Sequence, residues 1–212
     1  MDEYLQNNRD LWNEITPIHV ASEFYDVEGF KNGRNRLFYP VEFEEVGDVT
    51  GKSLSHLQCH FGMDTLTWAR RGAKVTGVDF SDEAIKKARS LSAELGIPAD
   101  FICSDIYELP QKLDKKFDIV YTSGGVLTWL PDLGKWASVI AHFLKYAGFS
   151  ISWKATRSSV FSMILRMPWN RKSGTHITSA MNRNTSSRKE IMPTLMPRSP
   201  MAHMSGIMAL AK

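Results

Sequence analysis

The chain has 212 residues, of which 43% are hydrophobic and 23% are charged, a composition typical of a globular protein with one sizeable core. No apolar run approaches the roughly eighteen residues of a membrane span, and the N-terminal residues are too polar and acidic for a signal peptide. We therefore expect a cytoplasmic protein with no membrane partner. The cysteines, Cys59 and Cys103, lack the spacing of zinc ligands, so we expect reduced thiols and no metal site.

The net charge of +3 is unevenly distributed along the chain. Residues 150–212 contain ten Lys and Arg and one acid, Glu190, a net charge of +9, which leaves 16 basic and 22 acidic residues, or −6, for residues 1–149. The two parts therefore differ in composition as two unrelated proteins would.

Residues 1–50 are predicted to form a helical cap followed by a loop. The apolar side chains near one helical face are Tyr4, Leu5, Leu11, Trp12 and Ile15. Pro17 is expected to interrupt this helix, and an aromatic stretch that includes Tyr25 follows it. Packing against a sheet is one role for these aromatic residues. The alternative is that the segment covers a ligand pocket, with His19 and Tyr25 as its polar groups.

Residues 51–81 carry the pattern that organises the chain. An apolar run at residues 54–57 ends in a turn that closes at Gly62, and a helical pattern then leads to a β-branched run at residues 75–78 that ends at Asp79. This order predicts a strand, a turn, a helix and a second strand that ends in an acid.

Such a unit is suited to a nucleotide-like ligand. The turn lets a ligand approach the backbone, the start of the helix offers free N–H groups, and a carboxylate at the position of Asp79 can accept both hydroxyls of a ribose. The turn has few of the glycines that are typical of nucleotide-binding turns. Gln58 and His60 stand where glycines are expected, and only Gly62 remains. A turn of the same topology that binds nothing is the alternative.

Strand and helix patterns continue to alternate up to residue 149. Ser81 is a predicted N-cap, and the helix that follows is expected to stop at Gly96. Residues 99–103 and 117–121 are predicted strands, the first of which leads to Asp105, and residues 133–144 are a predicted amphipathic helix. This alternation predicts a doubly wound α/β fold.

Four segments together resemble a known family. The segments are H-L-Q-C-H-F-G-M-D-T, T-G-V-D-F-S, C-S-D-I-Y-E-L-P and F-D-I-V-Y-T-S-G-G-V-L-T-W-L-P-D-L. In this order they resemble a bacterial family of class I S-adenosylmethionine-dependent methyltransferases, over about residues 8–149. The resemblance implies a seven-stranded Rossmann-like sheet with the methyl donor across the carboxyl ends of its first strands, beneath an N-terminal extension.

The resemblance also implies which residues bind S-adenosyl-L-methionine. The turn and the helix start would enclose the amino acid part of the donor, with Gln58, Cys59, His60, Gly62 and Asp64. Asp79 with Phe80 would bind the ribose and Asp105 with Ile106 the adenine, while Tyr121 lies at the end of the fourth strand. The chain departs from the family pattern in the depleted glycines of the turn.

The acceptor is expected beyond the same strand ends, where residues 121–129 follow the fourth strand. Trp129 and Leu130 are candidates for an apolar wall there, or for simple packing residues. Methyl transfer from a sulfonium depends mainly on positioning, so the sequence needs no conspicuous general base and we name no catalytic residue. We expect a small-molecule acceptor rather than nucleic acid.

The sequence pattern changes after residue 149. Eight of the ten methionines lie in residues 150–212, and no strand or amphipathic helix can be traced there. A basic tail that binds nucleic acid or a membrane surface, and plain disorder, are two explanations, but neither accounts for the methionines.

A shift of reading frame accounts for the methionines. Read from the last base of the codon for Phe149, residues 150–158 permit F-Y-I-M-E-G-H-P-V, a buried strand that ends as the fifth strand of the resembling family does. The same shift through residues 192–208 restores acids, aromatics and turn residues. We therefore interpret residues 1–50 as the cap, 51–149 as the donor-binding core, and 150–212 as an aberrant, poorly ordered tail. The sheet is then expected to be incomplete after strand four or five.

The sequence thus predicts a methyltransferase that uses S-adenosylmethionine. An inactive fragment that binds the donor is the first alternative. A nicotinamide-dependent oxidoreductase is the second, although Q-C-H-F-G replaces G-x-G-x-x-G. Nucleic-acid binding through the basic tail is the last, and it predicts an affinity that falls steeply with salt.

Overall fold

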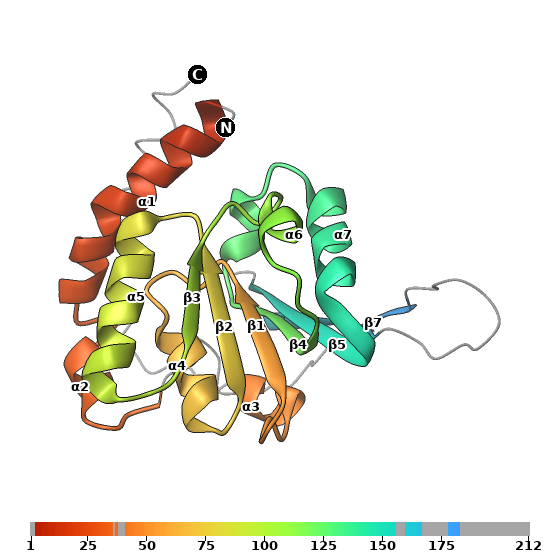
Figure 1. The fold of residues 1–212 in the computed structure, drawn as a ribbon, viewed down its shortest axis with the longest axis horizontal. Coiled ribbons are helices and arrows are strands. Elements are labelled where there is room, and N and C mark those ends of the chain that lie inside the picture. Colours follow the sequence, from red (N-terminus) through yellow and green to blue (C-terminus); the bar gives the residue numbers. More distant parts are fainter. Residues whose placement is uncertain (1–2, 36, 38–40, 156–159, 167–177, 183–212) are drawn as a thin grey trace.

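A seven-stranded sheet forms the centre of the computed structural model, which describes residues 3–35, 37, 41–155, 160–166 and 178–182 (Figure 1). The strand order is β3-β2-β1-β4-β5-β6-β7. The strands are β1 (Ser53–Leu57), β2 (Lys74–Asp79), β3 (Asp100–Cys103), β4 (Phe117–Thr122), β5 (Leu144–Ala155), β6 (Val160–Arg166) and β7 (Thr178–Asn182). The first five are parallel, whereas β6 and β7 are antiparallel to their neighbours.

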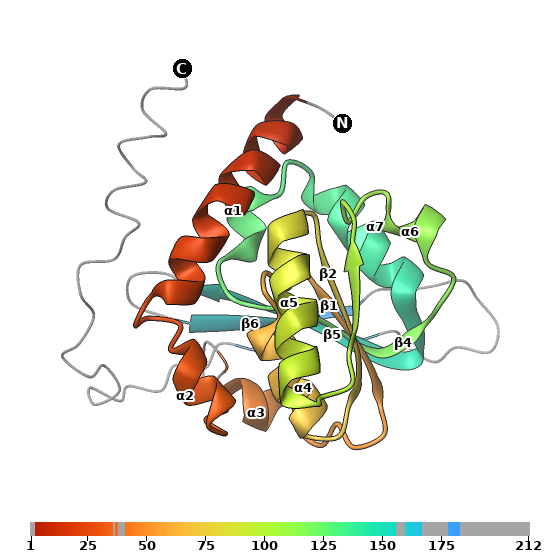
Figure 2. The ribbon, with the colours of Figure 1, turned by 60° about the vertical axis from the view of Figure 1, so that its left-hand side comes forward.

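Helices cover both faces of the parallel strands (Figures 1 and 2). The helices are α1 (Glu3–Ala21), α2 (Val27–Lys31), α3 (Val41–Val46), α4 (Met63–Arg70), α5 (Asp82–Leu95), α6 (Leu109–Lys112), η1 (Val126–Trp129) and α7 (Leu133–Phe143). Helices α4 and α5 lie on one face, and α6 and α7 on the other. The predicted doubly wound α/β fold of the Rossmann-like type is confirmed.

Local signals position the helices that follow the strands. The side chain of Ser81 accepts the backbone N–H of Ala84 at 3.1 Å and caps α5, which ends at Gly96 with a φ of 63°. The carboxylate of Asp132 caps α7 by accepting the N–H of Lys135 at 2.9 Å. Each cap supplies a partner for a helix-end N–H group, so these helices begin where the sequence predicts.

Large side chains fill the space between the helices and the sheet. On the face of α4, the buried rings of Trp68, Tyr121 and Trp153 belong to one apolar cluster. On the face of α7, Phe117 and Phe143 pack against each other with ring centroids 6.2 Å apart. Because helices cover both faces, the central strands β1, β2 and β4 are buried along almost their whole length.

The prediction that Pro17 interrupts the first helix is wrong. Helix α1 continues through Pro17 to Ala21. A proline removes one backbone N–H donor from a helix, and contacts to α5 and to the turn after β1 stabilise α1 on either side of that position. Tertiary contacts therefore override the local signal.

The sheet also continues where no strand was traced in the sequence. Strand β5 runs through Phe149, whose backbone pairs with Ile119 of β4, and ends at Ala155. Strands β6 and β7 then add to this edge in antiparallel orientation, and among the described residues no helix separates β5, β6 and β7. The parallel, helix-connected pattern thus ends at β5. Most of the predicted poorly ordered tail lies outside the described residues.

No helix within the described ranges has both the length and the apolar character needed to cross a membrane.

Candidate functional site

The turn between β1 and α4 has an unusual backbone. Gln58, His60 and Gly62 have φ angles of 57°, 51° and 80°, so every second residue is left-handed. For a residue with a Cβ atom this region costs about 1–2 kcal/mol. Gln58 and His60 therefore keep the backbone conformation of the glycines that the sequence analysis expects there, but each adds a side chain.

Gly62 is required at its position. A Cβ atom there would lie 2.8 Å from the ring of Phe101 and 3.0 Å from the Cβ of Ala88. Gly62 also directly precedes the first residue of α4. The absence of a side chain lets the turn pack closely on α5 and β3, and this positions the start of α4 at the end of β1.

The carboxylate of Asp79 lies at the end of β2, beside this turn. Its Oδ2 accepts the backbone N–H of His60 at 2.8 Å, and its Oδ1 accepts the backbone N–H of Ser81 at 2.9 Å. The residue is 6% exposed, and burial raises its pKa to about 6 in spite of these hydrogen bonds. Each carboxylate oxygen has a second acceptor position, so Asp79 can stabilise the turn and still accept a ligand hydroxyl.

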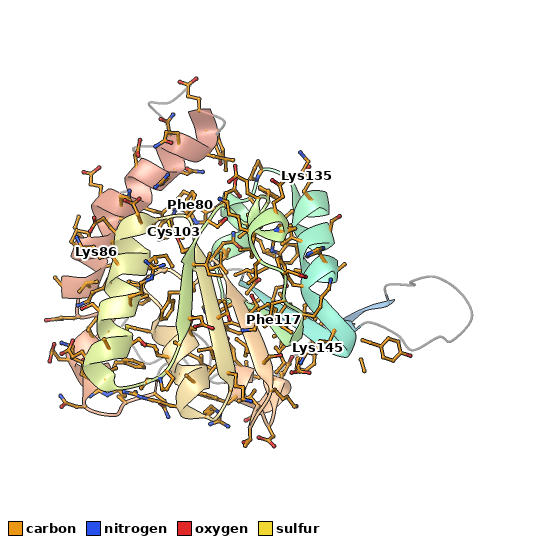
Figure 3. The ribbon with its side chains drawn as sticks, in the orientation of Figure 1. Phe80, Lys86, Cys103, Phe117, Lys135 and Lys145 are labelled. Atoms are coloured by element: carbon orange, nitrogen blue, oxygen red, sulfur yellow. The ribbon has the colours of Figure 1, made fainter. Side chains whose placement is uncertain are left out.

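The end of β3 lies next to Asp79. Cys103 pairs with Asp79 in the β2–β3 register, and Figure 3 shows Cys103 and Phe80 close together at these strand ends. Two residues further on, the half-buried Asp105 accepts the backbone N–H of Tyr107 at 2.9 Å. The side chains of Phe80 and Asp105 are therefore grouped with Asp79 at one edge of the sheet.

Three of the predicted site residues lie in the core. Cys59 is 4% exposed, and Ile106 is 5% exposed and packs in the cluster beneath α7. Tyr121 is fully buried, and its hydroxyl donates a hydrogen bond to the carboxylate of Glu42. In this structure these three side chains are part of the packing beneath the strand ends. Direct contact between them and a ligand stays a prediction. The half-buried Asp64 lies in the first turn of α4.

The cap meets the turn through a cluster of aromatic rings. His19 Nδ1 lies 3.0 Å from His60 Nε2, so the two imidazoles share one hydrogen bond. The ring of Trp12 lies 5.2 Å from that of His60 and 5.4 Å from that of Trp129, centroid to centroid. The ring of Tyr25 lies 5.7 Å from that of His60. The cap, the turn and the segment after β4 therefore converge on one point.

The sequence points to His19, Tyr25 and Trp129 as candidate pocket residues, whereas the place of Trp12 at the site is seen only in the structure. Trp12 was assigned to the apolar face of the first helix. Its spacing of seven residues from His19, two helical turns, was the signal that both face the same way.

Polar contacts attach the other part of α1 to α5. Asp82 Oδ1 accepts hydrogen bonds from Arg9 at 2.9 Å and from Asn13 at 2.9 Å. The hydroxyl of Ser81 donates to Asn13 Oδ1 at 2.6 Å. The cap thus lies against the first turn of the helix that follows Asp79 (Figure 2).

Burial keeps the histidines of the site neutral. It lowers the pKa of His56 and of His60 to about 3, and it lowers the pKa of His19. Among the described residues, Gln58 Oε1 and His60 Nδ1 are buried atoms without a hydrogen-bond partner. Because both atoms belong to the turn at the strand ends, they are placed to meet a polar ligand there.

Two pockets, of about 310 and 340 Å³, open beside the cap rather than beyond the strand ends. The first is lined by Tyr25, Asp26 and Arg34, among others. The site is therefore assigned on the grouped polar atoms and the turn geometry, not on pocket size.

Comparison with known proteins identifies the central part of the chain. Residues 56–148 match a protein family described as "Methyltransferase domain". This segment is similar to a methyltransferase domain. It contains the turn, Asp79 and Asp105, so the match supports the resemblance to class I methyltransferases. The subgroup marked by H-L-Q-C-H-F-G stays a prediction.

Curated relatives of the domain are O-methyltransferases. The chain is 30% identical over 151 residues to the ubiquinone biosynthesis O-methyltransferase of Escherichia coli (strain SMS-3-5 / SECEC), an alignment that covers 69% of this chain and 62% of the relative. It is 32% identical over 132 residues to the Klebsiella pneumoniae protein of the same name (strain ATCC 700721 / MGH 78578). This alignment covers 61% of this chain and 54% of the relative. The chain thus spans less than two thirds of the length of these relatives.

Solved structures share the fold. A putative S-adenosylmethionine-dependent methyltransferase from Methanococcus maripaludis aligns with a TM-score of 0.51 and 14% identity, over 73% of this chain and 66% of that one. The phosphoethanolamine N-methyltransferase 1 of Haemonchus contortus aligns with a TM-score of 0.56 and 16% identity, over 73% of this chain and 33% of that one. It was solved with phosphoethanolamine and S-adenosylhomocysteine. At these identities the likeness concerns the fold.

Proposed function

We propose that the protein is an S-adenosylmethionine-dependent methyltransferase that acts on a small molecule. The observation that carries the proposal is the pairing of a left-handed turn after β1 with the buried acid that ends β2, within a methyltransferase domain. In a doubly wound sheet a ligand binds beyond the carboxyl ends of the strands, which is where both features lie.

The residues at the strand ends fit the donor. Asp79 is proposed to accept the ribose hydroxyls, and Asp105 with Ile106 to contact the adenine. The turn from Gln58 to Asp64 is proposed to enclose the amino acid part, where the unpartnered Gln58 Oε1 and His60 Nδ1 suit its polar groups. The donor supplies a methyl group that is already activated on a sulfonium. The task left to these residues is to orient it and to exclude water.

The acceptor is proposed to lie between the cap and the segment after β4. Trp129 follows β4 and meets Trp12 of α1 there, and Thr122 Oγ1 is a further buried atom without a partner in the described part of the chain. The names of the curated relatives favour a hydroxyl group as the acceptor. No catalytic residue is assigned.

Calorimetric titration with S-adenosylhomocysteine tests the proposal. We expect saturable binding and, in an assay with labelled S-adenosylmethionine and phenolic acceptors, transfer of the label. Binding without transfer to any acceptor favours the inactive donor-binding fragment. Binding of a nicotinamide dinucleotide instead of S-adenosylhomocysteine favours the oxidoreductase and overturns the proposal.

We also propose that the chain consists of a cap at residues 1–50, a core at residues 51–149 and a tail at residues 150–212. The tail is proposed to be translated in a shifted reading frame. The change of composition at residue 149 and the methionine clustering support the shift. Sequencing the DNA around codons 145–152 tests it, and we expect one missing base. An intact frame would refute the shift and leave the assignment of the donor site unchanged.

A further inference from the structure

His60 occupies a backbone conformation that favours glycine. Its φ of 51° is left-handed, and it lies between two other left-handed residues, Gln58 and Gly62. Non-glycine residues in this region are strained, and they persist where the surrounding structure uses the side chain. The contacts of the imidazole can therefore explain why histidine, and not glycine, stands at this strained position.

The two ends of His60 contact different parts of the molecule. Its backbone N–H donates to Asp79 at 2.8 Å, at the edge of the sheet. Its imidazole Nε2 lies 3.0 Å from His19 Nδ1, and its ring packs edge-on against Trp12. Both His19 and Trp12 belong to α1. A single residue thus connects the acid at the end of β2 with the cap.

Other contacts also attach α1 near the strand ends. Thr16 is the residue of this helix that is buried, among those the structure describes. Arg9 pairs with Asp82, but their side chains are 31% and 53% exposed, and ion pairs at this exposure contribute little because solvent screens them. Asn13 of α1 also accepts the hydroxyl of Ser81 at 2.6 Å. Asp79 binds the backbone N–H groups of both Ser81 and His60. The half-buried pair of His60 and His19 is the anchor that belongs to the turn after β1.

We propose that His60 is a positioning residue of the donor site, which keeps α1 closed over the strand ends through His19 and Trp12. The inference rests on the proposed function, because it assigns to one residue of the donor turn the placement of the cap over the bound donor. Burial lowers the pKa of both histidines, so both are neutral at pH 7, and one ring donates the shared hydrogen bond while the other accepts it.

The variant that isolates this role is His60→Gly in the full chain. Glycine adopts the left-handed backbone without strain and keeps the N–H donor to Asp79, but it removes both the contacts with the cap and the Nδ1 atom proposed for the donor. Amide exchange of α1 measured without ligand reports the cap contacts alone. Ala147→Gly is the matched control, because Ala147 is also left-handed, with a φ of 62°, but lies near the start of β5, away from the strand ends. His60→Gln tests for rescue, since the amide of glutamine reaches the position of Nε2 and can pair with His19, and Gln58 already adopts a left-handed backbone in the same turn.

We expect His60→Gly to bind S-adenosylhomocysteine about 10-fold more weakly and to exchange the amide hydrogens of α1 about 10-fold faster, as for the loss of one buried hydrogen bond. The melting temperature stays the same or rises, because backbone strain is relieved. Ala147→Gly leaves affinity and exchange unchanged. His60→Gln recovers part of both losses. With His19→Ala added, His60→Gly loses no further affinity, because the two side chains act as one contact.

Unchanged affinity and unchanged exchange of α1 in His60→Gly would overturn the inference. Equal losses in His60→Gly and Ala147→Gly would overturn it too, because they would show a general effect of glycine. If the unsubstituted protein fails to bind S-adenosylhomocysteine, the proposed function fails, and faster exchange of α1 in His60→Gly would still show that His60 anchors the cap.

Discussion

The Oδ2 atom of Asp79 accepts the backbone N–H of His60 at 2.8 Å, so the acid that ends β2 fastens the turn that follows β1. The other oxygen of the same carboxylate accepts the N–H of Ser81, the N-cap of α5. One buried side chain thus stabilises the backbone on both sides of the proposed donor site. This double role shapes the effects expected from its substitution.

Replacing Asp79 with alanine is expected to weaken both ligand binding and the fold. Loss of a charged acceptor should reduce the affinity for S-adenosylhomocysteine by roughly 1 to 3 kcal/mol. Two backbone N–H groups also lose their acceptor, which should lower the free energy of unfolding by about 2 kcal/mol. Calorimetric titration and urea denaturation measure the two effects separately.

The comparison variant for Asp79 is asparagine. Its amide oxygen accepts one of the two N–H groups, so the loss of stability should be smaller than in Asp79→Ala. Unchanged affinity in both variants would mean that the donor binds elsewhere or not at all.

Replacing Gly62 with alanine is expected to destabilise the protein strongly. The new Cβ atom would lie 2.8 Å from the ring of Phe101, and the φ of 80° adds strain. We expect a loss of about 2–4 kcal/mol in urea denaturation from overpacking and strain together. Gly96→Ala is the control, because Gly96 has a φ of 63° but open space around its Cα, so about 1 kcal/mol is expected there. Equal losses would contradict the contact with Phe101.

Acid is expected to destabilise the protein through His56. This residue is 1% exposed near the carboxyl end of β1, where its Nδ1 lies 2.8 Å from Thr65 Oγ1, and burial lowers its pKa to about 3. Below pH 6.5 the unfolded chain binds a proton that the folded protein does not. The free energy of unfolding should therefore fall by about 1.4 kcal/mol per pH unit between pH 6.5 and about 3 for this one group.

The contribution of His56 is measured as the difference between the protein and His56→Gln across this pH range. The difference is needed because Asp79 has the opposite effect. Its pKa is raised to about 6, so the folded protein binds the extra proton below pH 6, and this stabilises the fold as the pH falls toward 3.8. A difference that does not vary with pH would show that His56 is not neutral in the folded state.

The ion pair between Arg9 and Asp82 is expected to contribute little. Both side chains are partly exposed, so Asp82→Ala should cost less than about 1 kcal/mol of unfolding free energy, and the cost should shrink as salt is added. Urea denaturation at low and high ionic strength measures this. A large cost that salt does not change would mean that this pair, and not His60, is the main anchor of α1.

Local signals in the sequence sufficed to predict the first four parallel strands. Strands β1 to β4, the N-cap at Ser81 and the stop at Gly96 were predicted within a residue or two, because each depends on neighbours in the chain. The positions of Gln58 and His60 in the turn were predicted from their spacing to Gly62, and the structure shows the left-handed backbone there. The grouping of Asp79 and Asp105 also followed, since parallel strands end at the same edge.

Only the tertiary structure decided the rest, because it depends on contacts between residues far apart in the chain. His19 and His60 are 41 residues apart, and Tyr121 and Glu42 are 79 apart, so neither the anchor of the cap nor the burial of Tyr121 has a local signal. The passage of α1 through Pro17 is likewise a result of its contacts with α5 and the turn. Local hydrogen bonding thus determined the order of elements, and long-range packing determined which side chains meet at the site.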